Sequence, residues 1–221
     1  MGTTQQTTEV IQVDAHDPDP QAIQRAAEVI RDGGLVVLPT DTVYGLVCDP
    51  RQTAAVDRIY EVKQRSRDLP LVVLLYDMVQ VETFLQDVPP AAVRAMQEFW
   101  PGALTVVLRD CSPATEPLRA CKETIGLRLP AHLVPREVAM CVGGGLASTS
   151  ANVSGGPSPV TAEEALAQLN GLVSLVLDAG PTKFAHESTV VSFESDPPEV
   201  LRVGAITVAR LREVLGEVRE K

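Results

Sequence analysis

Short apolar runs recur along the chain and predict buried β-strands. Four of them occupy Leu35–Leu38, Leu71–Leu75, Thr105–Leu108 and Leu172–Leu177. A continuous apolar run fits a strand that is covered on both faces. Shorter segments with strand character lie around 124–129, 146–151, 188–193 and 200–203. Because these are crowded toward the end of the chain, we expect some antiparallel pairing and no regular doubly wound order.

Amphipathic helices are predicted between these runs. The first opens at Asp19-Pro20, has apolar residues at helical spacing and ends before Gly33-Gly34. Three more lie at about 53–64, 90–100 and 161–169. The alternation of strands and helices favours an α/β fold, with a mixed parallel and antiparallel sheet flanked by helices.

Length and composition are those of an ordinary globular protein. A chain of 221 residues can bury a sizeable core without a second domain, so we expect one domain over residues 1–221. No apolar run approaches the roughly 18 residues of a membrane span, and the first residues lack a basic region and an apolar core. We therefore expect a cytoplasmic protein with no membrane partner.

Charge and cysteine spacing exclude two common classes of site. The formal net charge of −10 opposes nonspecific attraction to phosphate backbones. The four cysteines are widely spaced and have no neighbouring histidine, which favours reduced thiols over a zinc site: Cys48, Cys111, Cys121 and Cys141. The three histidines are scattered without an evident partner and are expected to be structural.

The segment 124–129 has a core face and a polar face. Side chains alternate along a strand, so Thr124, Gly126 and Arg128 share one face opposite the apolar side. The glycine clears space between a hydroxyl and a guanidinium, which suits a carboxylate or phosphate. A solvated strand face with an incidental arginine remains an equal alternative.

A second row of small polar side chains follows a glycine run. Period two places Ser148, Ser150 and Asn152 on one side, where they would line a pocket floor. The turn-forming residues 153–159 would then form a wall or lid. A polar outer face followed by a surface turn is the other interpretation.

Cations gather at the end of the helix predicted from Thr53. Helical spacing points Lys63 in the same direction as the buried stripe, and Arg65 and Arg67 follow the helix end. Local positive charge in an acidic protein favours a phosphate or pyrophosphate site. The alternative is that these cations only complement the helix dipole. The usual phosphate-binding loops, the nucleophile elbow and the zinc protease motif are absent.

Five ordered motifs resemble the YrdC-like threonylcarbamoyl-AMP synthases. The segments are Pro39–Leu46, Lys63-Gln64-Arg65 with Pro70-Leu71, Thr124–Pro130, Ser148–Asn152, and Pro181–Thr189 continued by Leu201–Gly204. The likeness spans about residues 20–216, and the flanking residues are expected to form short tails. It implies a YrdC-like twisted open sheet with a concave ligand cleft. Ser66 and Leu69 depart from the family, which commonly has proline and lysine there.

The resemblance implies a nucleotidyltransferase that makes L-threonylcarbamoyl-AMP and pyrophosphate from L-threonine, bicarbonate or CO2, and ATP. Its product would serve threonylcarbamoyladenosine formation in tRNA through downstream transfer proteins. The implied L-threonine site is Thr42, Arg128, Ser148 and Ser188. The implied ATP site is Lys63, Arg65, Thr124, Ser150, Asn152, Ser158 and Arg202, with Lys63 and Arg65 as the catalytic pair.

The same resemblance implies Mg²⁺ arriving with ATP, no organic cofactor and no metal ligand among the assigned side chains. Strong direct tRNA binding is not expected. Two alternatives stay open. One is an RNA-binding or ribosome-assembly module of the same superfamily that uses the basic run Lys63–Arg67. The other is a related adenylate-forming or carbamoyl-transferring enzyme that uses another amino acid.

Overall fold

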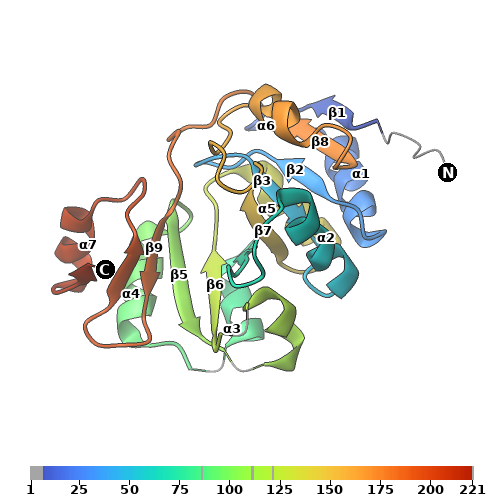
Figure 1. The fold of residues 1–221 in the computed structure, drawn as a ribbon. Coiled ribbons are helices and arrows are strands. Elements are labelled where there is room, and N and C mark those ends of the chain that lie inside the picture. The colour runs from blue at the N-terminus through green and yellow to red at the C-terminus, as the bar shows by residue number, and fades with distance from the viewer. Residues whose placement is uncertain (1–6, 86, 111, 121, 221) are drawn as a thin grey trace.

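The fold is a mixed β-sheet flanked by helices (Figure 1). The structure, a computed structural model, describes residues 7–85, 87–110, 112–120 and 122–220. Within them, strands follow the spatial order β1-β8-β2-β3-β7-β4-β6-β5-β9-β10-β11. Their bounds are β1 Glu9–Gln12, β2 Val36–Leu38, β3 Gly45–Cys48, β4 Val72–Leu74, β5 Leu104–Arg109, β6 Thr124–Arg128, β7 Leu146–Ser150, β8 Leu175–Asp178, β9 Thr189–Ser192, β10 Glu199–Arg202 and β11 Arg219–Glu220.

Both kinds of strand pairing occur, as the crowding of the later strands predicts. Strand β6 is parallel to β4 and antiparallel to β5, whereas β7 is antiparallel to both β3 and β4. All eight strand segments expected from the sequence are present. Strand β3 was not predicted, because it begins at a glycine inside the Pro39–Leu46 motif, where no apolar run stands out.

Several helices begin at a capping side chain that the sequence supplies, among them α1, α5, α6 and α7. The longer helices are α1 Pro20–Arg31, α2 Thr53–Lys63, α4 Pro90–Phe99, α5 Leu133–Val142, α6 Ala162–Leu169 and α7 Val208–Leu215; shorter turns form η1 Met78–Gln80, α3 Val81–Phe84 and η2 Pro113–Leu118. Asp19 caps α1 by accepting from the Gln21 amide, and Thr161 caps α6 in the same way from Glu164. Helix α5, also not predicted, holds Pro135 in its first turn, where a proline is tolerated, and ends at Gly143 with a φ of 82°.

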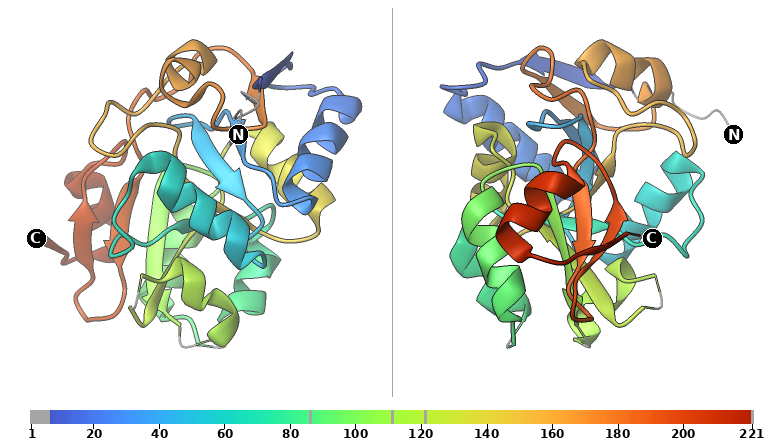
Figure 2. Two further views of the ribbon diagram at one scale, coloured as in Figure 1. Left: turned by 45° about the vertical axis from the view of Figure 1, so that its right-hand side comes forward. Right: turned by 90° about the vertical axis from the view of Figure 1, so that its left-hand side faces the viewer.

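Two apolar layers enclose the sheet. Helices α1 and α5 pack against each other over one face and cover Val36 and Leu146. Their strand neighbours Val37 and Ala147 point the opposite way, into a second cluster that includes α2 and α6. In the right-hand view of Figure 2, the red C-terminal helix α7 lies beside the green α4, a pair that is also in contact. No described helix is long and apolar enough to cross a membrane.

Candidate functional site

A cavity of about 500 Å³ lies at the middle strands of the sheet and is lined by both polar and apolar residues. Its walls come from segments far apart in the sequence, among them strands β4, β6 and β7 and the stretch 187–202. Four cations line it: Arg65, Lys122, Arg128 and Arg202. Four positive side chains around one hollow, in a chain with a net charge of −10, indicate an anionic ligand.

The predicted division of β6 into two faces is confirmed. Thr124, Gly126 and Arg128 line the cavity, whereas Ile125 and Leu127 belong to the apolar core. The missing side chain at Gly126 leaves space on the cavity side of the strand. An added Cβ would lie 3.4 Å from a Val72 methyl group, an ordinary contact, so the protein itself has room for a methyl group there and only a ligand would lose space.

Arg128 is the most buried cation of the cavity, and three of its five N–H groups are already bonded. Its Nε donates to the Gly102 carbonyl at 3.0 Å, Nη1 to Thr42 Oγ1 at 2.7 Å, and Nη2 to Asp41 Oδ1 at 2.6 Å. Two N–H groups, one on each Nη, remain for a ligand. Burial lowers the pKa of Arg128, and the Asp41 carboxylate opposes that effect. This arrangement fixes the guanidinium and keeps a forked pair of donors free for a carboxylate.

Strand β7 contributes the opposite wall. Ser148, Thr149 and Ser150 line the cavity, and β3 pairs alongside, with Gly45 opposite Ser150. Asn152 was expected in the same row, but it lies beyond the strand end and does not line the cavity. Its Oδ1 instead accepts from Ser150 Oγ at 2.6 Å. Of the predicted row, only Ser148 and Ser150 therefore line the cavity, and Asn152 holds Ser150 in place through this hydrogen bond.

Lys63 points inward, as its helical position predicts, but it does not line the cavity. Its Nζ donates to the Ser150 carbonyl at 2.5 Å, the Asn152 carbonyl at 2.6 Å and Asn152 Oδ1 at 3.0 Å. Burial, with Arg65 nearby, lowers the pKa of Lys63 to about 7, while these acceptors favour the charged form. All three N–H groups of the ammonium are therefore used within the protein.

Arg65 is the member of the basic run that faces the cavity. The C-cap Gln64 has a left-handed backbone with a φ of 50°, which turns the chain so that Lys63 and Arg65 point in different directions. Arg65 bonds the carbonyls of Leu69 and Pro70, leaving other N–H groups free. Burial lowers the pKa of Arg65, and the nearby Arg202 adds to the effect.

Arg67 and Leu69 take no part in the cavity lining. Arg67 pairs with Asp57 at 2.7 Å and stacks over the Tyr60 ring, so it cannot replace a cation at position 69. Leu69 is 45% exposed. Lys63 is buried and Arg67 is paired with Asp57 on α2, so neither side chain offers an unpaired, exposed charge to a phosphate backbone.

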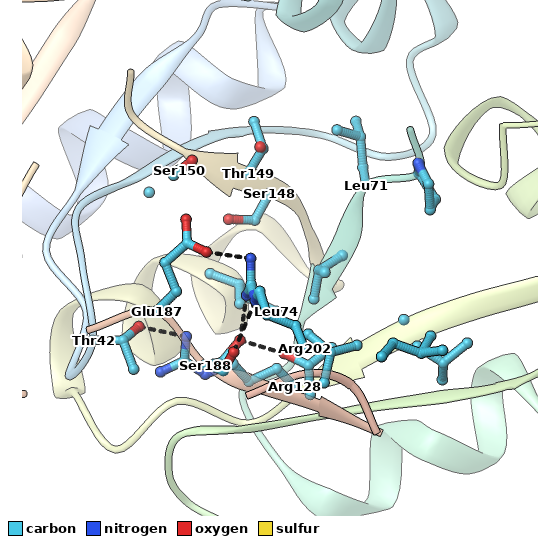
Figure 3. A pocket seen from close by; sticks show the side chains of 18 of the residues that line it. Thr42, Leu71, Leu74, Arg128, Ser148, Thr149, Ser150, Glu187, Ser188 and Arg202 are labelled. Carbon is cyan, nitrogen blue, oxygen red and sulfur yellow. Dashed lines mark hydrogen bonds and ion pairs between the residues drawn. The ribbon is translucent and has the colours of Figure 1, made fainter. Parts of the chain in front are cut away.

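The stretch 187–202 closes the remaining side of the cavity. Figure 3 shows Arg202 facing both Glu187 and Ser188, with Thr42 and Arg128 beside them. Arg202 pairs with the Glu187 carboxylate and donates to Ser188 Oγ at 3.2 Å. Ser158, expected in the ATP site, does not line the cavity but donates to Glu187 Oε1 at 2.6 Å. None of residues 153–159 lines the cavity, so the predicted wall or lid is in fact a support behind Glu187.

Three polar residues of the lining lie outside the five motifs and were not predicted: Thr105, Lys122 and Glu194. Thr105 shares a 2.8 Å hydrogen bond with Ser188 and lies in a run that reads as plain core. The alternation rule would have placed it on the cavity side of β5, since its neighbours Leu104 and Val106 are in the core. Lys122 precedes β6 and Glu194 follows β9, and no pattern in the sequence marks either residue.

The histidines and cysteines within the described residues stay outside this cavity. His132 Nδ1 accepts from the Val134 amide at the start of α5, and burial lowers the pKa of that imidazole. Cys48 is a free thiol whose pKa burial raises to about 12, and Cys141 is also free. Cys111 and Cys121 lie outside the described residues. Among the residues described, no group of three or more His, Cys, Asp or Glu side chains could hold a metal ion.

Comparison with known proteins gives one consistent family. The Sua5/YciO/YrdC family model, described as "Telomere recombination", matches residues 28–204. A threonylcarbamoyl-AMP synthase of Bacillus subtilis is 42% identical over 204 residues, covering 90% of this chain and 58% of the relative. A Mycobacterium leprae protein, which carries the same name provisionally, is 40% identical over 207 residues, covering 93% of this chain and 94% of its own.

The solved structures agree with this result. The crystal structure of Pyrococcus abyssi Sua5 complexed with L-threonine superposes with a TM-score of 0.93 at 34% identity and covers 97% of this chain. The match covers 63% of the Pyrococcus chain. This chain therefore spans less than two thirds of the Bacillus and Pyrococcus relatives and nearly the whole of the Mycobacterium one.

Proposed function

We propose that this chain, which belongs to the Sua5/YciO/YrdC family, makes L-threonylcarbamoyl-AMP and pyrophosphate from L-threonine, bicarbonate or CO2, and ATP. In this proposal the product supplies the threonylcarbamoyl group for an adenosine of tRNA, and downstream transfer proteins consume it. The work would take place in the cytoplasm, where ATP and tRNA meet. The names of the relatives and the threonine complex of the Pyrococcus protein support this choice.

One observation supports it most: the cavity has an amino-acid-sized end and a phosphate-suited end. At the first, Arg128 keeps two free N–H groups beside Thr42, within a shell of buried hydroxyls. At the second, Arg65 and Arg202 lie close enough that Arg202 lowers the pKa of Arg65. We assign the threonine carboxylate to Arg128 and the phosphates to Arg65 and Arg202.

The small polar side chains fit the parts of the substrate between these ends. Thr42, Ser148 and Ser188 would surround the amino acid, while Thr124 and Ser150 would face the nucleotide. Three residues outside the lining would act by positioning others. Lys63 and Asn152 would fix Ser150 at the end of β7, and Ser158 would hold Glu187. We propose that Lys63 is a positioning residue and not a phosphate ligand.

The proposed reaction needs alignment and charge neutralisation more than proton transfer. The carboxylated nitrogen of threonine carries an anionic oxygen, which forms a bond to the α-phosphorus while the bond to the α–β bridging oxygen breaks. Pyrophosphate leaves with that electron pair. An anionic nucleophile needs no general base, and Arg65 and Arg202 would stabilise the negative charge that develops on the phosphates.

A magnesium ion carried by ATP fits the cavity. Mg²⁺ is usually held by phosphate oxygens with one or two carboxylates, and two carboxylates line this cavity, on Glu187 and Glu194. Glu187 is paired with Arg202, whereas Glu194 forms no ion pair among the described residues. We propose Glu194 as the protein ligand. When bound, the ion would neutralise charge on the leaving pyrophosphate.

The test is pyrophosphate release from ATP by the purified protein, measured with and without L-threonine and bicarbonate. We expect release only when both are present, with the adenylate detected by mass spectrometry. Release that ignores threonine would refute the proposal. A screen of all twenty amino acids distinguishes it from a related enzyme with another substrate, because such an enzyme would turn over ATP with a different amino acid.

A further inference from the structure

Lys122 is the one cation of the cavity whose charged group has no partner within the described residues. Arg128 is bonded to Asp41 and Thr42, Arg202 to Glu187, and Arg65 to backbone carbonyls. Among residues 7–85, 87–110, 112–120 and 122–220, no hydrogen bond or ion pair involves the Lys122 ammonium, although the residue lines the cavity. Such an ammonium is available to an incoming anion without first breaking a contact to these residues.

The backbone under Lys122 is held in place, so the free side chain starts from a fixed point. Arg119, which is buried, receives a hydrogen bond from the Lys122 amide at 3.0 Å. In return, Arg119 Nη1 donates to the Lys122 carbonyl at 3.2 Å and to the Asp110 carbonyl at 2.6 Å. Arg119 thus ties the turn before β6 to the end of β5. A flexible lysine on a fixed backbone suits a mobile, highly charged group.

Lys122 also lies at the far end of the cavity from Arg128. It precedes Thr124, and the four residue steps from Thr124 to Arg128 span about 13 Å at the usual rise of a strand. Arg128 therefore marks one end of β6 and Lys122 lies beyond the other. A ligand whose amino-acid carboxylate is at Arg128 would extend its last phosphates toward Lys122.

We propose that Lys122 binds the pyrophosphate portion of ATP, that is, the β- and γ-phosphates. This inference rests on the proposed function, since it takes the ligand to be a nucleoside triphosphate that releases pyrophosphate. Lys122 supplies the cation that neither Arg67 nor Leu69 provides, because Arg67 is paired with Asp57 and Leu69 is apolar. It acts with Arg65 and Arg202, which line the same cavity.

Binding of inorganic pyrophosphate and of AMP, measured by titration calorimetry without threonine, tests the proposal. We expect Lys122→Gln to weaken pyrophosphate binding about ten-fold, the effect of losing one charge-assisted contact, and to leave AMP binding within about two-fold. Lys122→Arg should retain most of the affinity. Added salt should shrink the difference between Lys122→Gln and the unchanged protein, because the contact is exposed.

Lys183→Gln is the matched control, since it removes the same charge from an exposed lysine that does not line the cavity. It should bind pyrophosphate as the unchanged protein does. The proposal is overturned if the unchanged protein does not bind pyrophosphate, if Lys122→Gln binds it equally well, or if AMP binding falls by the same factor. Because these titrations need no turnover, a failure of the threonine-dependent reaction is a separate result.

Discussion

The pair formed by Asp41 and Arg128 allows the sharpest test of how the cavity is held together. Their side chains are 1% and 7% exposed, and the Asp41 Oδ1 oxygen also accepts from the Ala131 amide at 3.2 Å. Replacing Asp41 with asparagine keeps the size of the side chain and an oxygen acceptor but removes the charge. Arg128 would then be a buried cation without a counter-charge.

The expected cost follows from that burial. Removing one partner of a buried pair typically destabilises a protein by 3–5 kcal/mol, and the lower end, about 3 kcal/mol, applies because Arg128 keeps its bonds to Thr42 and Gly102. With a urea m-value of about 2 kcal/mol/M, the unfolding midpoint of Asp41→Asn should fall by about 1.5 M.

The assay is urea unfolding at neutral pH, and Asp57→Asn is its control. Asp57 also pairs with an arginine, Arg67, but both side chains are substantially exposed, so their pairing contributes little and the midpoint should barely move. If Asp41→Asn lowers the midpoint no more than Asp57→Asn does, the reasoning that Arg128 depends on Asp41 is refuted.

Three further outcomes follow from single residues. Burial lowers the pKa of Lys63 from 10.5 to about 7. Between pH 7 and 10.5 the unfolded chain therefore binds more protons than the folded chain, so the free energy of unfolding rises with pH. Lys63→Met should flatten this rise when stability is measured by urea unfolding. Gly126→Ala should keep its melting temperature, because the new methyl group has room beside Val72, yet it should lose at least about ten-fold in pyrophosphate release by occupying the cavity floor. Gln64→Gly should raise the free energy of unfolding by about 0.5–1 kcal/mol, because glycine adopts the left-handed backbone conformation without steric strain. The greater entropy of glycine in the unfolded chain offsets part of this gain. An unchanged midpoint in chemical unfolding would contradict this.

Local periodicity predicted the parts of the site that depend on one strand. The alternation of Thr124, Gly126 and Arg128 against the core residues followed from the sequence alone, because side chains on a strand alternate whatever the rest of the chain does. Four strand segments could be found because a strand covered on both faces has a short continuous apolar run. Helix α5 was missed because Pro135 and the short length conceal its start in the sequence.

Contacts between distant segments could not be predicted in this way. Asp41 reaches Arg128 across 87 positions, and Lys63 reaches Asn152 across 89, so no local pattern contains either pair. Helical spacing correctly predicted that Lys63 points inward. It could not tell whether phosphate or backbone carbonyls would meet the ammonium there, because that depends on where β7 ends.

The fate of Lys63 explains why the phosphate end of the cavity depends on loops. An ammonium bonded to the Ser150 and Asn152 carbonyls has no N–H group left for a ligand, and it fixes the end of β7 instead. The chain then turns at Gln64 through a left-handed residue, which sends Arg65 into the cavity. Because the helix uses its last cation to position a strand, the cations proposed to meet phosphate come from elsewhere. They are Arg65 after α2, Lys122 before β6 and Arg202 at the end of β10. In the proposed function, Lys63 therefore leaves phosphate binding to Arg65, Arg202 and Lys122, whose side chains are less buried than that of Lys63 and more exposed to salt.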